Sequence, residues 1–364
     1  MTQATSSSEV NDPFEGFVLG MAIGDSLGLP REGLTPRRAS RLYGLAPLRH
    51  HFVFGYGLVS DDTEHMVMTA LSLLAEPDDS ARFARCLARN LRWWLVGLPA
   101  GVGLATAKSI IRMWLGWSPA SSGVRSAGNG PAMRAGVLGL CLHDDEAKLR
   151  EYVRVSTRLT HTDSRAETGA LLIALAARAG LRMKGTPTNA SSFLQTCRIE
   201  APDGEWQHVF EQLQISLTNV ESAAQFAERL GLQRGVTGYI VHTVAAVLFC
   251  WLRWPDEFRH PMEAILELGG DADTTAAILG GLLGASHGAD SIPREWLNGL
   301  IEWPCSVTWM REQLAPAMRS IAEANAFTAT LRVSRWRWPA QLARNALFLV
   351  VVLFHGFRRL LPPY

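Results

Sequence analysis

Two short acidic stretches carry the side chains in this sequence that are best suited to chemistry. The first, SDDT, spans Ser60–Thr63, the second, GGDADT, spans Gly269–Thr274, and each opens an apolar helical run. Four carboxylates gathered at one place repel by roughly 4 kcal/mol per close pair at an effective dielectric of about 20, so a fold that gathers them needs cations between them. Hydroxyl and carboxylate oxygens, with no histidine or cysteine pattern beside them, favour magnesium or manganese over zinc.

Ordinary helix capping is the alternative interpretation of both stretches. A Ser or Asp at a helix start accepts hydrogen bonds from free backbone amides, and Glu64 follows Asp61 by three residues, as in a capping box. Capping needs one such residue, whereas the second stretch offers Asp271, Asp273 and Thr274 directly after two glycines, which let a ligand approach the backbone. Taken together, the two stretches predict a metal site.

Three further segments carry polar residues suited to ligand binding. Ser126–Pro131 (SAGNGP) places two glycines and an asparagine before a proline at an expected helix start, which leaves amides free for a phosphate; an ordinary helix start is the alternative. His161 precedes a capped helix expected to run to Ala179, although a single histidine is more often structural. Glu32 follows the segment GDSLGLPR, and a lone acid of this kind is usually solvated surface.

Nearly the whole chain from Phe14 onward has helical periodicity. Ala and Leu dominate, apolar residues recur three and four apart, and alternating strand patterns are nearly absent, so the predicted fold class is all-α. Glycines within Ala276–Ala285 would each cost nearly 1 kcal/mol relative to alanine in a helix interior, which predicts close packing of a neighbouring helix. Loops are predicted at residues 52–59, 117–130, 184–204 and 251–261.

Composition limits the class of protein. At 364 residues with 48% hydrophobic content, the chain can bury a large core. Thirty-five Lys and Arg balance 34 Asp and Glu, and the resulting net charge of +1 gives no direct nucleic-acid binding signal. The five cysteines lack CxxC spacing, which suggests neither a disulfide framework nor a zinc site and fits a reducing cytoplasm. Residues 1–13 do not resemble a secretory signal and are predicted to be a flexible lead.

Five motifs, in order, resemble those of the ADP-ribosylglycohydrolase family. They are GDSLGLPRE at Gly24–Glu32, SDDT at Ser60–Thr63, GNGPAMR at Gly128–Arg134, LTH at Leu159–His161 and GGDADTTAAILGGLLGA at Gly269–Ala285. The ordered set is far more specific than any one motif, and the paired acidic turns are its most distinctive part. The resemblance covers most of residues 14–328, which are predicted to form one catalytic domain.

The resemblance implies a fold, two metal ions and a set of site residues. The fold would be a compact orthogonal multi-helix bundle with a central dinuclear site for two Mg²⁺ or Mn²⁺ ions. The implied metal ligands are Ser60, Asp61, Asp62, Asp271, Asp273 and Thr274. The implied candidates for the catalytic acid that steers or deprotonates water are Glu32 and Asp62. The implied substrate-binding residues are Ser126, Gly128, Asn129, Gly130 and His161, with Tyr239 as a weaker candidate for stacking on adenine.

The implied reaction is metal-assisted hydrolysis of the glycosidic bond between ADP-ribose and an acceptor, either an ADP-ribosylated protein side chain or a small ADP-ribose derivative. A prenyl-diphosphate synthase also uses aspartate-rich helices, but it needs DDxxD spacing, and Asp62 is followed by Thr-Glu-His. His65 in that triplet is expected to face the core. A non-catalytic ADP-ribose-binding or structural descendant of the same fold is the other alternative, although it has no reason to keep four clustered carboxylates.

Residues 329–364 depart from the family pattern. Tryptophans and arginines at 332–338 precede the apolar run Ala346–Phe354, and two arginines follow. A spanning helix needs about 20 apolar residues, so this run is too short unless Arg344 or Arg358 snorkels. A helix at a membrane surface or against a partner protein is the favoured interpretation, with packing onto the catalytic core and a membrane span as alternatives. The prediction is a cytoplasmic protein that is peripheral at a membrane through residues 332–361.

Overall fold

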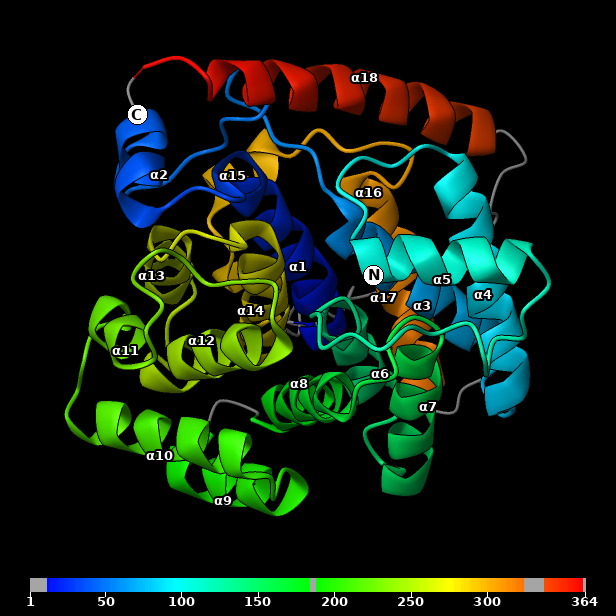
Figure 1. The fold of residues 1–364 in the computed structure, drawn as a ribbon, viewed down its shortest axis with the longest axis horizontal. Helices are drawn as coiled ribbons and strands as arrows, with labels where there is room; N and C mark the ends of the chain where they lie inside the picture. The colour runs from blue at the N-terminus through cyan, green and yellow to red at the C-terminus, as the bar shows by residue number, and fades with distance from the viewer. Residues whose placement is uncertain (1–11, 184–187, 324–336, 363–364) are drawn as a thin grey trace, which may run out of the picture.

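The computed structural model describes residues 12–183, 188–323 and 337–362, which fold into a helical body (Figure 1). In these ranges β pairing is limited to isolated bridges, such as the one between Leu34 and Gly270, so the predicted all-α class is confirmed. The N-terminal lead up to residue 11 lies outside the described residues. Arg332, Arg335 and Trp336 of the C-terminal extension also lie outside them.

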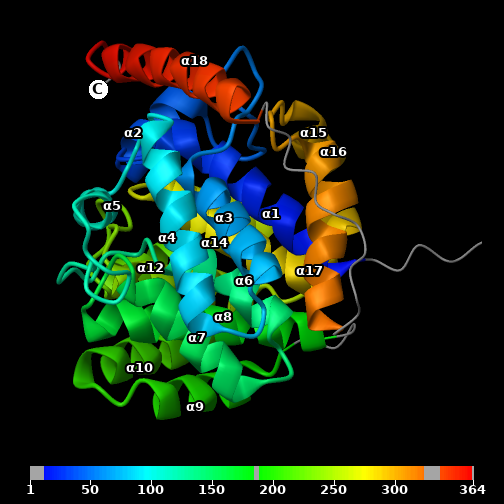
Figure 2. The ribbon, with the colours of Figure 1, turned by 90° about the vertical axis from the view of Figure 1, so that its right-hand side faces the viewer.

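Two helices, α1 (Pro13–Gly28) and α14 (Ala272–His287), form the centre of the body, and both views place α18 at one edge and α9 and α10 at the opposite edge (Figures 1 and 2). The surrounding helices are α2 (Pro36–Tyr43), α3 (Asp61–Ala75), α4 (Ser80–Val96), α5 (Leu104–Trp114), α6 (Ala135–Cys141), α7 (Glu146–Arg158), α8 (Ser164–Arg182), α9 (Ala190–Glu200), α10 (Gly204–Thr218), α11 (Ala223–Arg229), α12 (Ile240–Arg253), α13 (Arg259–Glu267), α15 (Arg294–Gly299), α16 (Val307–Trp309), α17 (Ala315–Ala322) and α18 (Arg337–Arg358). Short 3₁₀ turns lie at Leu29–Arg31, Ala132–Arg134 and Ala289–Ser291, and a π-helical turn lies at Met310–Leu314.

Glycines bring the backbones of α1 and α14 into direct contact. Residues four apart share a helix face, and α1 repeats glycine at this interval from Gly16 to Gly28. A Cβ added at Gly20 would overlap the carbonyl oxygen of Gly280, and one added at Gly24 would overlap that of Ala276. The close packing predicted from the glycines of α14 is therefore present, with α1 as the neighbouring helix.

The contact also fixes which helix ends meet. Gly16 lies against Gly284 near one end of the pair, and Gly28 lies against Asp273 at the other, so the helices run antiparallel. The C-terminal end of α1, which carries Asp25, therefore lies beside the N-terminal end of α14. Acidic residues from opposite ends of the sequence meet as a consequence of this packing.

One predicted loop is wrong in part. Residues 184–204 contain α9, because Asn189 caps its first turn by accepting a hydrogen bond from the amide of Ser192 at 2.9 Å. Phe193 and Cys197 of this helix are buried in the main core. The Ser, Thr and Asn residues that were interpreted as loop formers serve instead as a helix cap and an exposed helix face.

Replacing Gly24 with alanine is predicted to lower the free energy of unfolding by about 1–3 kcal/mol, because the added methyl group meets backbone atoms of α14. Urea unfolding of both proteins measures the change. Gly356→Ala in α18 is the matched control, since open space surrounds that position and alanine should be neutral or up to about 1 kcal/mol stabilising. Equal destabilisation by both substitutions would contradict the backbone contact.

Candidate active site

Asp25 on α1 holds the first acidic turn in place. This fully buried carboxylate accepts hydrogen bonds from the amide of Ser60 at 2.9 Å, from the amide of Thr63 at 3.0 Å and from the hydroxyl of Thr63 at 2.5 Å. Ser60 is the N-cap of α3, as expected, and its hydroxyl accepts from the amide of Asp62. Sequence reasoning did not assign Asp25 to the site, although its position on a face of small residues was a signal.

The second acidic turn is fixed between two loops. Gly269 and Gly270 have positive φ angles of 64° and 78°, which other residues rarely adopt. The amide of Gly270 donates to the carbonyl oxygen of Leu34, and the amide of Asp271 donates to that of Val236, both at 2.7 Å. The turn that carries Asp271 is thus attached to the segment that follows Glu32.

The two turns meet directly. The hydroxyl of Thr274 donates to Oδ2 of Asp62 at 3.2 Å, across 212 residues of sequence. The hydroxyl of Ser60 donates to the same oxygen at 3.3 Å. The other oxygen of Asp62, Oδ1, is buried and has no hydrogen-bond partner.

A cavity of about 540 Å³ lies in front of the two turns. Among its lining residues are the predicted Glu32, Asp61, Asp271, Asp273, Thr274, Ser126, Gly128, Asn129, Gly130 and His161. Ser60 and Asp62 lie behind this lining, only 4% and 1% exposed. Tyr239 is not among the lining residues of this cavity; its hydroxyl donates to Glu205 and accepts from Arg165.

The carboxylates around the cavity have raised pKa values, because they are buried and lie close to one another. Burial, followed by neighbouring carboxylates, raises the pKa of Asp61, Asp62 and Asp273 well above the usual range. Burial also raises the pKa of Glu32, with Asp271 as the next cause. The described lining includes neither lysine nor arginine, so no side chain of the cavity wall offsets this negative charge.

The donor chemistry of the two turns fits a hard divalent cation. Carboxylate and hydroxyl oxygens are the ligands that magnesium and manganese prefer, and Oδ1 of Asp62 is a buried acceptor without a donor. In the part of the chain that the structure describes, however, no three His, Cys, Asp or Glu side chains form a ready-made metal-binding group. The fold places the donor residues around one space without closing them into a coordination shell.

The glycine loop of the cavity is less open to phosphate than the sequence predicted. The amide of Gly128 donates to the hydroxyl of Ser126 at 3.2 Å, and the amide of Asn129 donates to the carbonyl oxygen of Gly238 at 3.0 Å. The expectation that these amides are free is therefore wrong. Asn129 instead uses its side chain, which donates to Oδ2 of Asp271 at 2.5 Å and links the loop to the second acidic turn.

His161 is held as a neutral side chain. Its Nδ1 lies 2.8 Å from the hydroxyl of Thr160, which also accepts a hydrogen bond from the buried Arg134. Burial, followed by the charge of Arg134, lowers the pKa of His161 to about 3. His65 is fully buried and packs edge-on against Trp94, so it faces the core as predicted.

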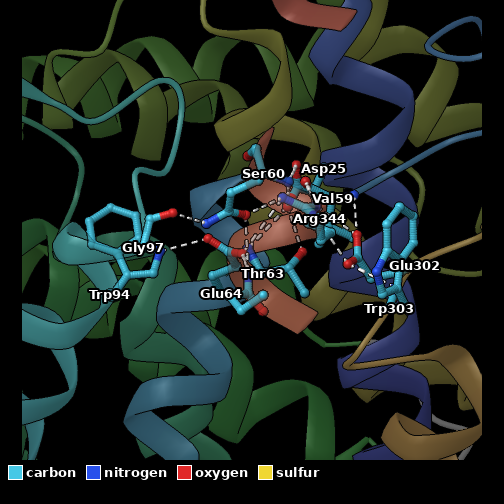
Figure 3. A network of polar contacts seen from close by, with 12 residues as sticks. Asp25, Val59, Ser60, Thr63, Glu64, Trp94, Gly97, Glu302, Trp303 and Arg344 are labelled. Atoms are coloured by element: carbon cyan, nitrogen blue, oxygen red, sulfur yellow. Dashed lines mark hydrogen bonds and ion pairs between the residues drawn. The ribbon is translucent and has the colours of Figure 1, made fainter. Parts of the chain in front are cut away.

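Helix α18 packs onto the catalytic body beside the first acidic turn (Figure 3). Arg344, which is 2% exposed, donates to both oxygens of Glu302 and to the carbonyl oxygen of Val59, the residue before Ser60. Glu302 in turn accepts from the amide of Val59 at 3.0 Å. The described part of the extension therefore packs onto the core, which was one of the alternatives for it.

A second set of contacts ties α18 to α3 and α4. Gln341 donates to Oε1 of Glu64, which also lies 3.7 Å from the guanidinium of Arg344. Asn345 donates to the carbonyl oxygen of Gly97 at 2.7 Å. The sequence did not favour packing of α18 onto the core, because an arginine before an apolar run, such as Arg344, is also typical of a membrane flank.

These observations define an all-α protein with an acidic, glycine-walled ligand cavity at its centre. The chain belongs to the ADP-ribosylglycohydrolase family, which it matches over residues 6–329. It is 28% identical over 299 residues to the ADP-ribosyl-[dinitrogen reductase] glycohydrolase of Rhodospirillum rubrum, covering 80% of this chain and 91% of that protein. It is 27% identical over 318 residues to the ADP-ribosylhydrolase ARH3 of Danio rerio, covering 78% and 85%.

A solved structure, the "ADP-ribosylglycohydrolase-related protein complex", has a TM-score of 0.63 and 27% identity and covers 86% of this chain and 98% of that chain. The family and the names of these relatives support ADP-ribosyl glycohydrolase activity. The non-catalytic alternative is not favoured. The matched region ends before α18, so the helix that packs beside the first acidic turn lies outside the part shared with the family.

Arg344→Met is predicted to lower the free energy of unfolding by about 3–5 kcal/mol, because it leaves Glu302 buried without its cation. Chemical denaturation measures the loss. Combining it with Glu302→Gln should recover part of the stability, since the unpaired charge is then removed. Arg358→Met, at a half-buried position, is the control with an expected change within about 0.5 kcal/mol. A loss equal to the control would contradict the buried pair.

The contribution of His161 to the free energy of unfolding is predicted to fall as pH drops from 6.5 towards 3. The folded protein keeps this side chain neutral, whereas the unfolded chain binds a proton below pH 6.5, so this contribution is complete above pH 6.5 and is lost below it. Between pH 7 and pH 5, His161→Gln should remove about 2 kcal/mol of this loss. An unchanged loss of stability in His161→Gln would contradict a neutral His161 in the folded protein.

Proposed function

We propose that this protein is a divalent-metal-dependent hydrolase that cleaves the glycosidic bond between ADP-ribose and an acceptor. The observation that carries the proposal is the contact between the two acidic turns, made by the hydrogen bond from Thr274 to Asp62. The cavity beside this contact has the size of a small-molecule binding site. Family membership supplies the substrate class, since the matched relatives are named for ADP-ribosyl hydrolysis.

Charge is the argument for metal dependence. The diphosphate of ADP-ribose is negative, and the described cavity lining has four carboxylates, Glu32, Asp61, Asp271 and Asp273, without a basic side chain. An anionic ligand would be repelled by this wall unless cations lie between them. The residues that would hold two Mg²⁺ or Mn²⁺ ions are Ser60, Asp61, Asp62, Asp271, Asp273 and Thr274. When bound, such ions polarise a water molecule and neutralise charge near the scissile bond.

Glu32 is the better of the two candidates for handling the proton of the attacking water. It lines the cavity, and its pKa, raised by burial and by Asp271, suits a group that both accepts and returns a proton. Asp62 is almost completely buried behind the lining, and its Oδ2 already accepts from two hydroxyls. We therefore assign Asp62 to metal binding and Glu32 to general acid and base catalysis.

The glycine loop and His161 are proposed to bind the ADP-ribose. Ser126, Gly128, Asn129 and Gly130 form one wall of the cavity, and their small side chains leave room for a ligand. A Cβ at Gly128 or Gly130 would meet the ring of His161 at 3.1 or 3.3 Å, so glycine lets this ring reach the wall. Because the ring is neutral, His161 offers a hydrogen bond rather than a charge.

The test is hydrolysis of a panel of ADP-ribosylated substrates, including arginine- and serine-linked peptides, with Mg²⁺, Mn²⁺ or chelator. Activity is expected with metal and not with chelator, and Glu32→Gln should lower kcat by about 10²–10⁴. Metal should also raise the Tm of the wild type and of Glu32→Gln, but not of Asp62→Asn.

Glu257→Gln, an exposed acid on another part of the surface, is the control and should keep both activity and the metal-induced rise in Tm. Turnover that survives chelator would refute metal dependence. ADP-ribose binding by calorimetry without turnover of any substrate would instead support a non-catalytic binding protein.

A further inference from the structure

The outward face of α18 is apolar. Leu347, Val350, Phe354 and Phe357 recur three and four residues apart and are between 46% and 68% exposed. From the first to the last of these residues the stripe is about 15 Å long. A row of large apolar side chains on the outside of a domain marks an interaction surface rather than chance exposure.

The orientation of this face is fixed by polar contacts on the other side of the helix. Arg344 binds Glu302, Asn345 binds the carbonyl oxygen of Gly97, and Nε2 of His355 lies 2.8 Å from the carbonyl oxygen of Phe52. The inward side of α18 thus combines these polar residues with the buried Phe348, while large apolar residues lie on the outward side. Rotation of α18 to hide its apolar stripe would break all of these contacts.

The same contacts argue against a membrane span. Pro339–Arg358, which extends the apolar run Ala346–Phe354 past Arg344 and Arg358, is long and apolar enough to cross a membrane by length and composition alone. Crossing would transfer Arg344, Asn345 and His355 from their hydrogen-bond partners into lipid, at a cost of several kcal/mol for the arginine alone. The helix therefore lies along the surface of the catalytic body, with its apolar side free to contact another surface.

The loop beside α18 adds an exposed aromatic side chain. Phe52 packs on Phe348 and on His355, with ring centroids 5.0 and 5.4 Å apart. Two residues later, at the tip of the turn closed by Val53 and Tyr56, Phe54 is 99% exposed. An aromatic ring at the tip of a surface turn is suited to insertion between lipid headgroups.

The two segments that form this surface carry basic but no acidic side chains in sequence, although Glu263 and Glu267 of α13 line the same pocket as Arg37. Residues 33–59 and 337–364 contain no Asp or Glu, although the whole chain is nearly neutral. Helix α2 in the first segment contacts the end of α18, where Arg38 donates to the carbonyl oxygen of Arg359. Arg37 and Arg41 of α2 are exposed, and Arg358 and Arg359 directly follow Phe357, so the basic side chains of this surface gather toward the C-terminal end of the stripe.

We propose that this face, formed by the outer side of α18, the loop at Phe54 and the arginines of α2, binds the surface of a membrane that contains anionic lipids. The apolar stripe would enter the headgroup region, and the arginines would meet the lipid phosphates and carboxylates. A second copy of this chain fits less well. A two-fold axis through the stripe would bring like-charged arginines together.

The experiment is co-sedimentation of the full chain with two kinds of vesicle. One contains phosphatidylcholine alone, and the other contains phosphatidylcholine with about 30% phosphatidylserine, which imitates an anionic membrane surface. The protein should bind the anionic vesicles, and the bound fraction should fall as salt rises. Phe354→Ser with Phe357→Ser should reduce the partition coefficient at least about tenfold, because two apolar anchors are lost. Arg37→Glu with Arg41→Glu should reduce it by a similar factor.

Leu115→Ser, which removes a 75% exposed apolar residue after α5, is the matched control and should keep wild-type binding. Circular dichroism and Tm of every variant show that each remains folded. Failure to bind either vesicle would overturn the proposal, as would equal binding by the wild type and the Phe354→Ser, Phe357→Ser variant. Light scattering that shows a dimer, lost in the same variant, would identify the face as a contact between copies and would also overturn it.

Discussion

Direct contact between the backbones of α1 and α14 is the constraint on which the rest of the structure depends. Without side chains between them at Gly20, Gly24 and Gly280, the two helices approach until their peptide groups touch. Side chains on either helix would separate the pair and would move Asp25 away from the turns that it organises. The position of the cavity is therefore set by residues that do not line it.

This packing gathers negative charge that the protein alone does not balance. Three aspartates in the two turns have a pKa well above the usual range, chiefly because they are buried. Folding without a cation must either leave these groups protonated or keep them ionised at a cost in stability. The proposed cations would remove this cost, so the protein should be more stable with them than without them.

The sequence allowed the fold class, the close packing of α14 and the location of both acidic turns to be predicted, because each depends on local composition and spacing. It did not identify the role of Asp25, since a carboxylate that binds backbone amides looks the same in sequence as one that faces solvent. The expectation of free amides at Gly128 and Asn129 was wrong for a related reason. The amide of Gly128 donates to a serine hydroxyl, and the amide of Asn129 donates to the carbonyl oxygen of the distant Gly238. Contacts of this kind depend on tertiary packing, which motif spacing does not encode.

The ion pair between Glu302 and Arg344 joins the region that matches the family to a helix that lies beyond the match. Glu302 lies inside the region that matches the family, whereas Arg344 lies beyond it. A buried acid at position 302 is tolerable only while the helix that supplies its guanidinium is present. Loss of the appendage in a descendant would thus have to be accompanied by replacement of that acid, so the two residues should be inherited or discarded together.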